Sequence, residues 1–206
     1  MGFSSTAQTS ASFTDARDGQ VYQTVSWEMT MTEDSTKTMT WMAENLKFNI
    51  EGSSCFNDDE ANCENYGRLY NFFAAMEACP VGWSLPSNHQ WQQLVDQFGG
   101  LEKAGKMLKS KSRLWKGSKP KLEDAYLGGT RYAGNNRSGF DILPTGVGTS
   151  ETGFYKFGLS AVFWSSSSET ASTAWDWIFS VSSSRVINST GDKKSTGNAV
   201  RCIKDE

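Results

Sequence analysis

Residues 79–91, CPVGWSLPSNHQW, link two helical patterns and decide how the chain folds. Pro80 ends the first pattern, because proline lacks an amide hydrogen and clashes with the preceding turn of a helix. Pro86 pushes the residue before it toward extended geometry, so VGWSLP is expected to be a short extended segment. The stretch therefore predicts a helix that ends at a cysteine, a short strand and the start of a second helix.

The second helix is predicted over residues 87–98. Ser87 is suited to cap its first turn, and Gln90 three residues later completes a capping box. Gly99 and Gly100 then close the helix. The apolar residues recur with helical spacing and are expected to be buried against a sheet: Trp91, Leu94, Val95 and Phe98.

The first helix is predicted from RLYNFFAAMEAC, residues 68–79, whose apolar residues form a helical stripe. The members of this stripe are Leu69, Phe72, Phe73, Met76 and Cys79. A short basic helix is expected after it, in LEKAGKMLKSKSRLW, residues 101–115.

Alternating segments predict strands on both sides of these helices. In residues 19–29, Val21, Gln23, Val25 and Trp27 alternate with Tyr22, Thr24 and Ser26, and residues 38–46 alternate again. The polar TMTEDSTK, residues 30–37, is expected to be the hairpin loop between them. In WDWIFSV, residues 175–181, the tryptophans share one face. We expect Trp83, Trp164, Trp175 and Trp177 to belong to the core.

Helices predominate in the first half and short strands in the second, which predicts an α+β fold. Residues 1–15 are rich in Ser and Thr and are expected to form a flexible lead-in, followed by a single domain over residues 16–206. The first residues contain no apolar core of a signal peptide, so none is expected there.

The composition excludes some classes of partner. The net charge is -3 and the pI is about 5.3, so no basic surface for nucleic acid or anionic membranes is indicated. No apolar run approaches the roughly 18 residues that span a bilayer. The oligomeric state is left open by these features.

The four cysteines, Cys55, Cys63, Cys79 and Cys202, include no C-x-x-C pair, and His89 is the single histidine. Zinc sites usually require closer ligand pairs, so disulfides are the better interpretation. Disulfides predict an extracellular or cell-surface location.

Several stretches, in order along the chain, resemble the Fibrobacter succinogenes major paralogous domain family. The resemblance runs from about residue 15 to the end. The matching stretches are DARDGQVYQTV, WMAENL, YGRLYNFFAA, ACPVGWSLPS, GFDILPTG, FWSSS and VRCIKD.

This resemblance implies a C-type lectin-like fold, with two helices packed on twisted antiparallel sheets and long irregular loops. It also implies a bridge between Cys79 and Cys202, which leaves Cys55 and Cys63 as a local pair. The Glu-Pro-Asn, Gln-Pro-Asp and Trp-Asn-Asp motifs of calcium-dependent lectins are missing, so their sugar site is not implied. Members of the family look like surface or secreted proteins of fibre-degrading and gut bacteria.

The sequence favours no catalytic site. His89 is expected on the exposed face of its helix, which argues against a triad. The carboxylates Glu123, Asp124 and Asp141 have no distinguishing context for glycoside hydrolysis. Formylglycine-generating enzymes share the implied fold but need reactive cysteines. We therefore predict that the chain is not an enzyme and has no cofactor.

The acidic loop of residues 57–64 is a possible calcium site, because its side chains offer the hard oxygen ligands that calcium accepts. Those side chains are Asn57, Asp58, Asp59, Glu60, Asn62 and Glu64. The spacing of a calcium-binding EF-hand is missing, and a local disulfide explains an ordered polar loop. No metal site is predicted.

The surplus of aromatic residues favours ligand binding, because tryptophan and tyrosine rings stack on sugar faces while neighbouring polar groups bind hydroxyls. We predict an extracellular binding or adhesion module for polysaccharide or a cell-surface protein. The alternative is a structural or assembly subunit of a surface fibre or pilus-like structure. The candidate ligand-binding residues lie in the middle loops: Trp115, Tyr126, Arg131, Tyr132, Asn135, Asn136 and Tyr155.

Overall fold

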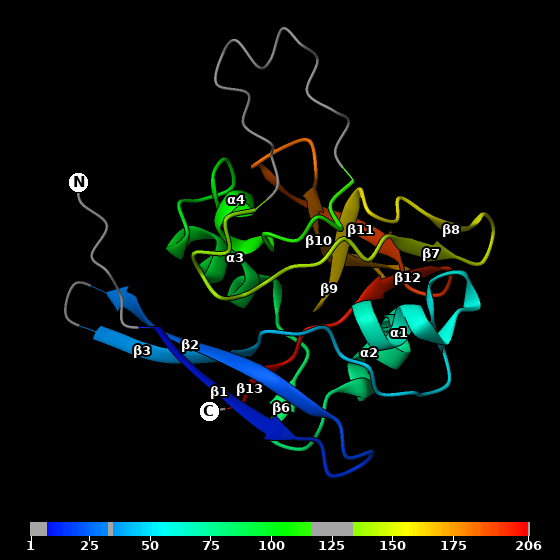
Figure 1. Ribbon diagram of the computed structural model, residues 1–206, viewed down its shortest axis with the longest axis horizontal. Helices are drawn as coiled ribbons and strands as arrows, with labels where there is room; N and C mark the ends of the chain where they lie inside the picture. Colours follow the sequence, from blue (N-terminus) through cyan, green and yellow to red (C-terminus); the bar gives the residue numbers. More distant parts are fainter. Residues whose placement is uncertain (1–7, 33–34, 117–133, 206) are drawn as a thin grey trace, which may run out of the picture.

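The computed structural model describes residues 8–32, 35–116 and 134–205, and its architecture is mixed α+β (Figure 1). One sheet has five strands in the order β1-β2-β3-β13-β6. Its strands are β1 (Gln8–Thr14), β2 (Val21–Thr32), β3 (Ser35–Met42), β13 (Ile203–Lys204) and β6 (Trp83–Ser84). The last strand of the chain therefore pairs beside its first hairpin.

The second sheet has the path β11-β10-β9-β12-β5-β4, with β7 and β8 attached through β12. Its strands are β4 (Ser53–Ser54), β5 (Leu69–Tyr70), β7 (Val147–Thr149), β8 (Gly153–Tyr155), β9 (Ser160–Ser168), β10 (Thr173–Ser180), β11 (Val186–Asp192) and β12 (Thr196–Ala199). The pairs are antiparallel except β12 with β9, which meet in parallel at Ala199 and Phe163.

The helices are short: the 3-10 turn η1 (Phe56–Asp58), α1 (Glu60–Tyr66), α2 (Phe72–Ala78), α3 (Asn88–Gln97) and α4 (Ala104–Leu108). Helix α3 begins with the predicted capping box of Ser87 and Gln90. Its Trp91 is fully buried, with its ring centroid 5.1 Å from that of Trp41 in β3 and 5.4 Å from that of Phe163 in β9. Helix α3 thus joins the two sheets.

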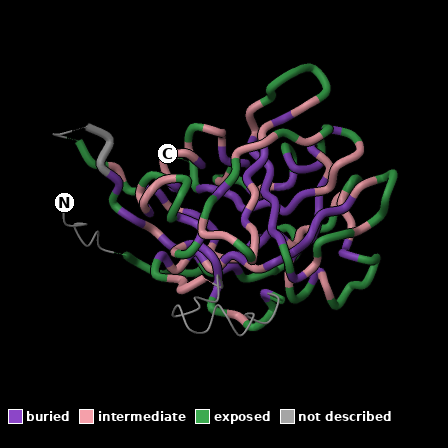
Figure 2. The backbone as a smooth tube through the Cα atoms, turned by 90° about the horizontal axis from the view of Figure 1, so that it is seen from above, coloured by how far each residue is buried: buried purple, intermediate pink, exposed green. Residues whose placement is uncertain are grey.

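The predicted burial of Trp91, Leu94, Val95 and Phe98 is confirmed. Figure 2 shows buried backbone running through the central strands, with exposed segments at the loops. Trp164 and Trp177 are fully buried as predicted, whereas Trp83 and Trp175 are half-buried.

Both predicted disulfides are present. Cys79, at the end of α2, is bonded to Cys202, just before β13, across 123 residues of sequence. Cys55 is bonded to Cys63, between the start of η1 and the middle of α1. The first bridge ties the first half of the chain to its last strand, and the second closes one polar loop.

The prediction of a flexible lead-in over residues 1–15 is wrong for Gln8–Thr14, which forms β1. All seven residues pair in register with β2. Phe13 anchors the strand, because its ring stacks on Trp83 at 4.5 Å and on Tyr22 at 5.6 Å. A Ser/Thr-rich segment with one well-placed aromatic residue is therefore ordered by tertiary contact rather than by its own composition.

The β2–β3 hairpin also differs from the prediction. Most of residues 30–37, expected to be a loop, belongs to the two strands. Tyr22, expected opposite the buried face, is itself buried, and its hydroxyl accepts a hydrogen bond from the Lys47 amide at 3.0 Å. Val21 is exposed instead. Residues on both faces of β2 are buried, so the alternation of the sequence does not tell which of its side chains are exposed.

Helix α2 is shorter than predicted and buries a different face. Asn71 caps it, and Leu69 and Tyr70 lie in β5 rather than in the helix. The exposed fractions of Phe73 and Met76 are 52% and 49%. The buried positions are Phe72, Ala74, Ala75 and Ala78. Alanines, not the large apolar residues, form most of the packed face.

Candidate functional site

The predicted middle-loop site is not assembled as expected. Tyr126, Arg131 and Tyr132 lie outside the described residues. Trp115 is 6% exposed, and its indole N–H donates to Ser110 Oγ at 3.1 Å and to the Ile142 carbonyl at 3.2 Å. The prediction that Trp115 is a loop-borne stacking ring is therefore wrong, because its polar sequence neighbours hide a core side chain.

The other described members of that set serve local structure. The Asn136 side chain donates to Asp141 Oδ1 at 2.7 Å and accepts from the Asp141 amide at 2.9 Å. Asn135 Oδ1 accepts from the Arg137 amide at 3.1 Å. Tyr155 is 39% exposed in β8, and no contact in the described part joins it to either asparagine.

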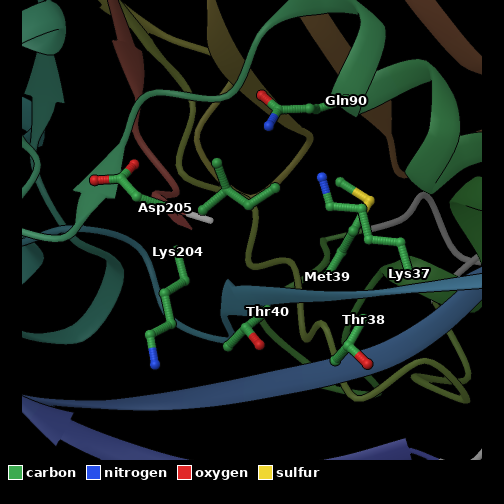
Figure 3. A pocket seen from close by; sticks show the side chains of 8 residues that line it. Lys37, Thr38, Met39, Thr40, Gln90, Lys204 and Asp205 are labelled. Carbon is green, nitrogen blue, oxygen red and sulfur yellow. The ribbon is translucent and has the colours of Figure 1, made fainter.

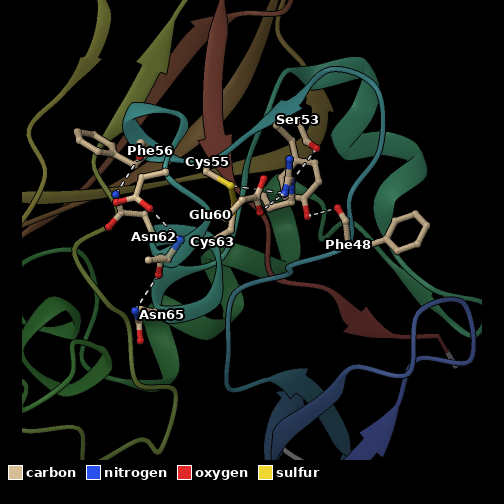
Figure 4. The surroundings of a disulfide bond; sticks show 12 residues. Phe48, Ser53, Cys55, Phe56, Glu60, Asn62, Cys63 and Asn65 are labelled. Atoms are coloured by element: carbon tan, nitrogen blue, oxygen red, sulfur yellow. Dashed lines mark hydrogen bonds and ion pairs between the residues drawn. A yellow bond between two sulfur atoms is a disulfide. The ribbon is translucent and has the colours of Figure 1, made fainter.

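The acidic loop of residues 57–64 is held by its own hydrogen bonds (Figure 4). Asp59 caps α1 by accepting from the Ala61 amide, and Asn62 donates to the Phe56 carbonyl at 2.9 Å. Glu60 forms an ion pair with Arg68 at 3.4 Å. Glu60 also lies close to both sulfurs of the Cys55–Cys63 pair, but a disulfide has no thiolate to offer a metal.

A shallow hollow of about 200 Å³ lies between β3, α3 and β13. Lys37 and Met39 rise from β3 toward Gln90, whereas Thr38 and Thr40 lie on the other face of the strand (Figure 3). The Gln90 side-chain oxygen already accepts from the Ser87 amide at 2.8 Å. The hollow is smaller than the ~300–1,000 Å³ of pockets that enclose ligands, so it is a weak candidate.

The strongest candidate lies on β10 beside a bulge in β9. Between the pair Ala174–Ser168 and the pair Asp176–Trp164, β10 advances by two residues and β9 by four. Residues 165–167 therefore stand opposite Trp175 alone. Bulges of this kind re-aim side chains and are frequent next to functional sites.

The bulge is fixed by the start of α3. The Ser166 amide donates to the Pro86 carbonyl at 2.9 Å, and the Asn88 amide donates to Ser167 Oγ at 3.0 Å. The Ser165 hydroxyl accepts from the Ser167 amide at 3.0 Å. The segment that decides the fold thus also holds the strand region next to Trp175.

Trp175 is a half-buried tryptophan whose side chain makes no hydrogen bond or ring contact with any described residue. Thr190 of β11 lies directly opposite it and is exposed. The next pair on the same face is Trp177 with Asn188. The Asn88 side-chain oxygen accepts a hydrogen bond from the side chain of each, at 2.9 Å. We name Trp175, Thr190 and Asn188 the Trp175 face.

The other face of β10 holds a buried carboxylate. Asp176 is 5% exposed, and burial raises its pKa to about 6, although the Asn198 amide, at 3.4 Å from Oδ2, lowers it. Asp176 Oδ1 and Asn198 Oδ1 have no hydrogen-bond partner in the described part. Burial and one amide therefore set this pKa.

Sequence reasoning placed Trp175 in the core because it alternates in register with Trp177 and Phe179. The alternation is real, but Trp175 is only half-buried, whereas Trp177 and Phe179 on the same face are fully buried. The two extra residues in β9 lie within FWSSSSE, whose serines reveal no bulge by pattern. No signal in a single sequence identifies this position.

The last observations concern the whole chain rather than a single site. Among the described residues, no helix is long and apolar enough to cross a membrane. No curated protein and no solved structure matches the sequence. Residues 35–204 match the family described as the Fibrobacter succinogenes major domain. This match covers most of the chain and all four cysteines, and it begins at β3, so β1 and β2 lie before it. The chain therefore belongs to the Fibrobacter succinogenes major domain family.

Proposed function

We propose that this chain is an extracellular, non-catalytic module with a C-type lectin-like fold that binds polysaccharide through the Trp175 face. The observation that carries the proposal is the half-buried Trp175 ring, which makes no side-chain hydrogen bond and no aromatic or cation–π contact with the described residues. Indole rings gain dispersion contact and lose water when the apolar face of a sugar stacks on them.

Polar groups beside the ring support a sugar rather than an apolar ligand. The hydroxyls of Thr190 and Ser166 form no hydrogen bond within the described part, and neither does Asn188 Oδ1. These groups offer donors and acceptors to sugar hydroxyls around a stacked ring.

Charge and cysteine chemistry support the non-catalytic and extracellular parts of the proposal. His89 is exposed, and no charged residue of the described part contributes to the raised pKa of Asp176. Both disulfides are favoured in oxidising compartments. The order of helices and the Cys79–Cys202 pairing agree with the lectin-like fold that the resemblance implies.

The test is retention on insoluble polysaccharides and on immobilised soluble ones, with wild type beside Trp175→Ala, Trp175→Phe and Tyr155→Ala. Loss of one stacking ring of about 1 kcal/mol weakens binding about fivefold. We expect weakened retention for Trp175→Ala and partly restored retention for Trp175→Phe. Tyr155→Ala should be retained like wild type. Weakening by Tyr155→Ala alone would move the site to the middle loops.

The same assay with EDTA tests for a metal requirement. We expect binding to persist, because the described groups on the Trp175 face are neutral. Loss of binding in EDTA would point instead to the acidic loop of residues 57–64, whose carboxylates suit calcium.

The second candidate function, a structural or assembly subunit, is favoured by a different observation. Strand β1 is an exposed edge strand with one pairing partner. Absence of binding to any polysaccharide, together with self-association, would favour this function.

A further inference from the structure

Strand β1 leaves one whole side open in the described structure. It lies at the end of the five-stranded sheet and pairs with β2 along all seven residues. No backbone hydrogen bond joins residues 8–14 to any other described segment. Six of the seven residues are exposed, and Phe13 is half-buried. A row of backbone donors and acceptors is therefore available to a further strand.

This edge lacks the devices that usually protect edge strands. Such devices are charged side chains, prolines, bulges or a short strand. The sequence of β1, QTSASFT, has no charge and no proline, and its pairing with β2 shows no register shift. The paired part of β2, residues 21–27, is also uncharged.

The contrast with β11, a strand at one edge of the other sheet, is informative. That strand ends in Asp192 and is preceded by Arg185, and both residues are exposed. Charges at both ends oppose the approach of a second copy of β11 unless each meets an opposite charge. Strand β1 imposes no such condition over its paired length, so it is the edge that a copy of the same chain is free to approach.

We propose that two copies of this chain pair through β1 in antiparallel orientation, centred on Ala11. This register pairs all seven residues under two-fold symmetry. It sets Ser10 opposite Ser12 of the second copy and Thr9 opposite its Phe13. Hydroxyl pairs and aromatic pairs with β-branched residues are favourable cross-strand neighbours, and no like charges meet.

The expected association is weak. A seven-residue strand pair buries less than the roughly 1,000 Å² of a stable interface. Weak pairing becomes effective where copies are concentrated, and it would join two Trp175 faces into one bivalent unit. Dimerisation through β1 is independent of the sugar site, because β1 and Trp175 lie in different sheets and association is measured separately from polysaccharide binding.

The test is sedimentation equilibrium over a concentration series for wild type, Ala11→Lys and Ala11→Glu. The control is Leu159→Lys, which adds the same charge at an exposed position just before β9 of the other sheet. Wild type and the control are expected to dimerise with the same dissociation constant. Either Ala11 variant should raise that constant by about fivefold or more. An equimolar mixture of the two Ala11 variants should form a heterodimer tighter than either homodimer.

Proline substitutions give a second readout that separates folding from association. Neighbouring amides in a strand point to opposite sides, so one of Ser10 and Ala11 donates toward β2 and the other toward the open edge. One of Ser10→Pro and Ala11→Pro should lower the melting temperature strongly, and the other should abolish dimerisation while unfolding near the wild-type temperature. A monomeric wild type, or a dimer indifferent to the Ala11 charges, would overturn the proposal.

Discussion

Trp91 of α3 and Trp41 of β3 meet edge to face, with ring centroids 5.1 Å apart and an interplanar angle of 62°. Trp91 also donates its indole N–H to the Trp164 carbonyl of β9 at 3.2 Å. One side chain therefore touches both sheets, and the helix that begins after Pro86 works as the central connector of the fold.

Trp91→Ala is expected to lower the free energy of unfolding by about 3–5 kcal/mol, the range for large aromatic truncations in a core. Urea unfolding of the variant, with His89→Ala on the exposed side of the same helix as control, measures this loss. A loss below about 1 kcal/mol for Trp91→Ala would match a surface substitution and contradict the connector role.

The two disulfides should differ in their contribution to stability. The Cys79–Cys202 bridge closes 123 residues and the Cys55–Cys63 bridge closes 8. Chain entropy predicts about 4–5 kcal/mol for the long loop and about 2–3 kcal/mol for the short one. Paired alanine variants, which leave no unpaired thiol, should show this order in chemical unfolding, and the reverse order would contradict it.

Asp176 should make stability fall as pH rises. Its pKa is raised by burial to about 6 in the folded state, above the usual 3.8. The neutral carboxyl therefore stabilises the folded state. This stabilisation is fully present below the usual pKa and is lost as pH rises through the folded pKa. The shift corresponds to up to about 3 kcal/mol.

Unfolding free energies of wild type and Asp176→Asn, measured from about pH 4 to about pH 8, check this titration. The variant retains the shape of the side chain but has no carboxyl to ionise. We expect its stability relative to wild type to increase as pH rises through about 6. Parallel curves would mean that the Asp176 carboxylate is hydrated or otherwise compensated.

Local signals in the sequence predicted what depends on local chemistry. The capping box at Ser87 and the apolar spacing through Phe98 are short-range features, and α3 follows them closely. The disulfide pairing came from the resemblance to a family, because four cysteines alone leave several pairings open.

Tertiary contacts decided what the sequence could not. Strand β1 is ordered because Phe13 finds Trp83, a residue 70 positions later in the chain. Trp115 is buried because Ser110 and Ile142 receive its indole hydrogen, although its neighbours look like an exposed loop. Trp175 is less buried than Trp177 on the same face, and it lies beside a bulge in β9 that has no sequence pattern.

The central claim, that the Trp175 face binds polysaccharide, is tested most directly by titration calorimetry. Wild type, Trp175→Ala and Trp175→Phe are titrated with the soluble polysaccharide that wild type retains best. We expect measurable wild-type binding, about fivefold weaker binding for Trp175→Ala and an intermediate value for Trp175→Phe. Equal affinities for the three proteins, or no heat of binding for wild type with any polysaccharide, would contradict it.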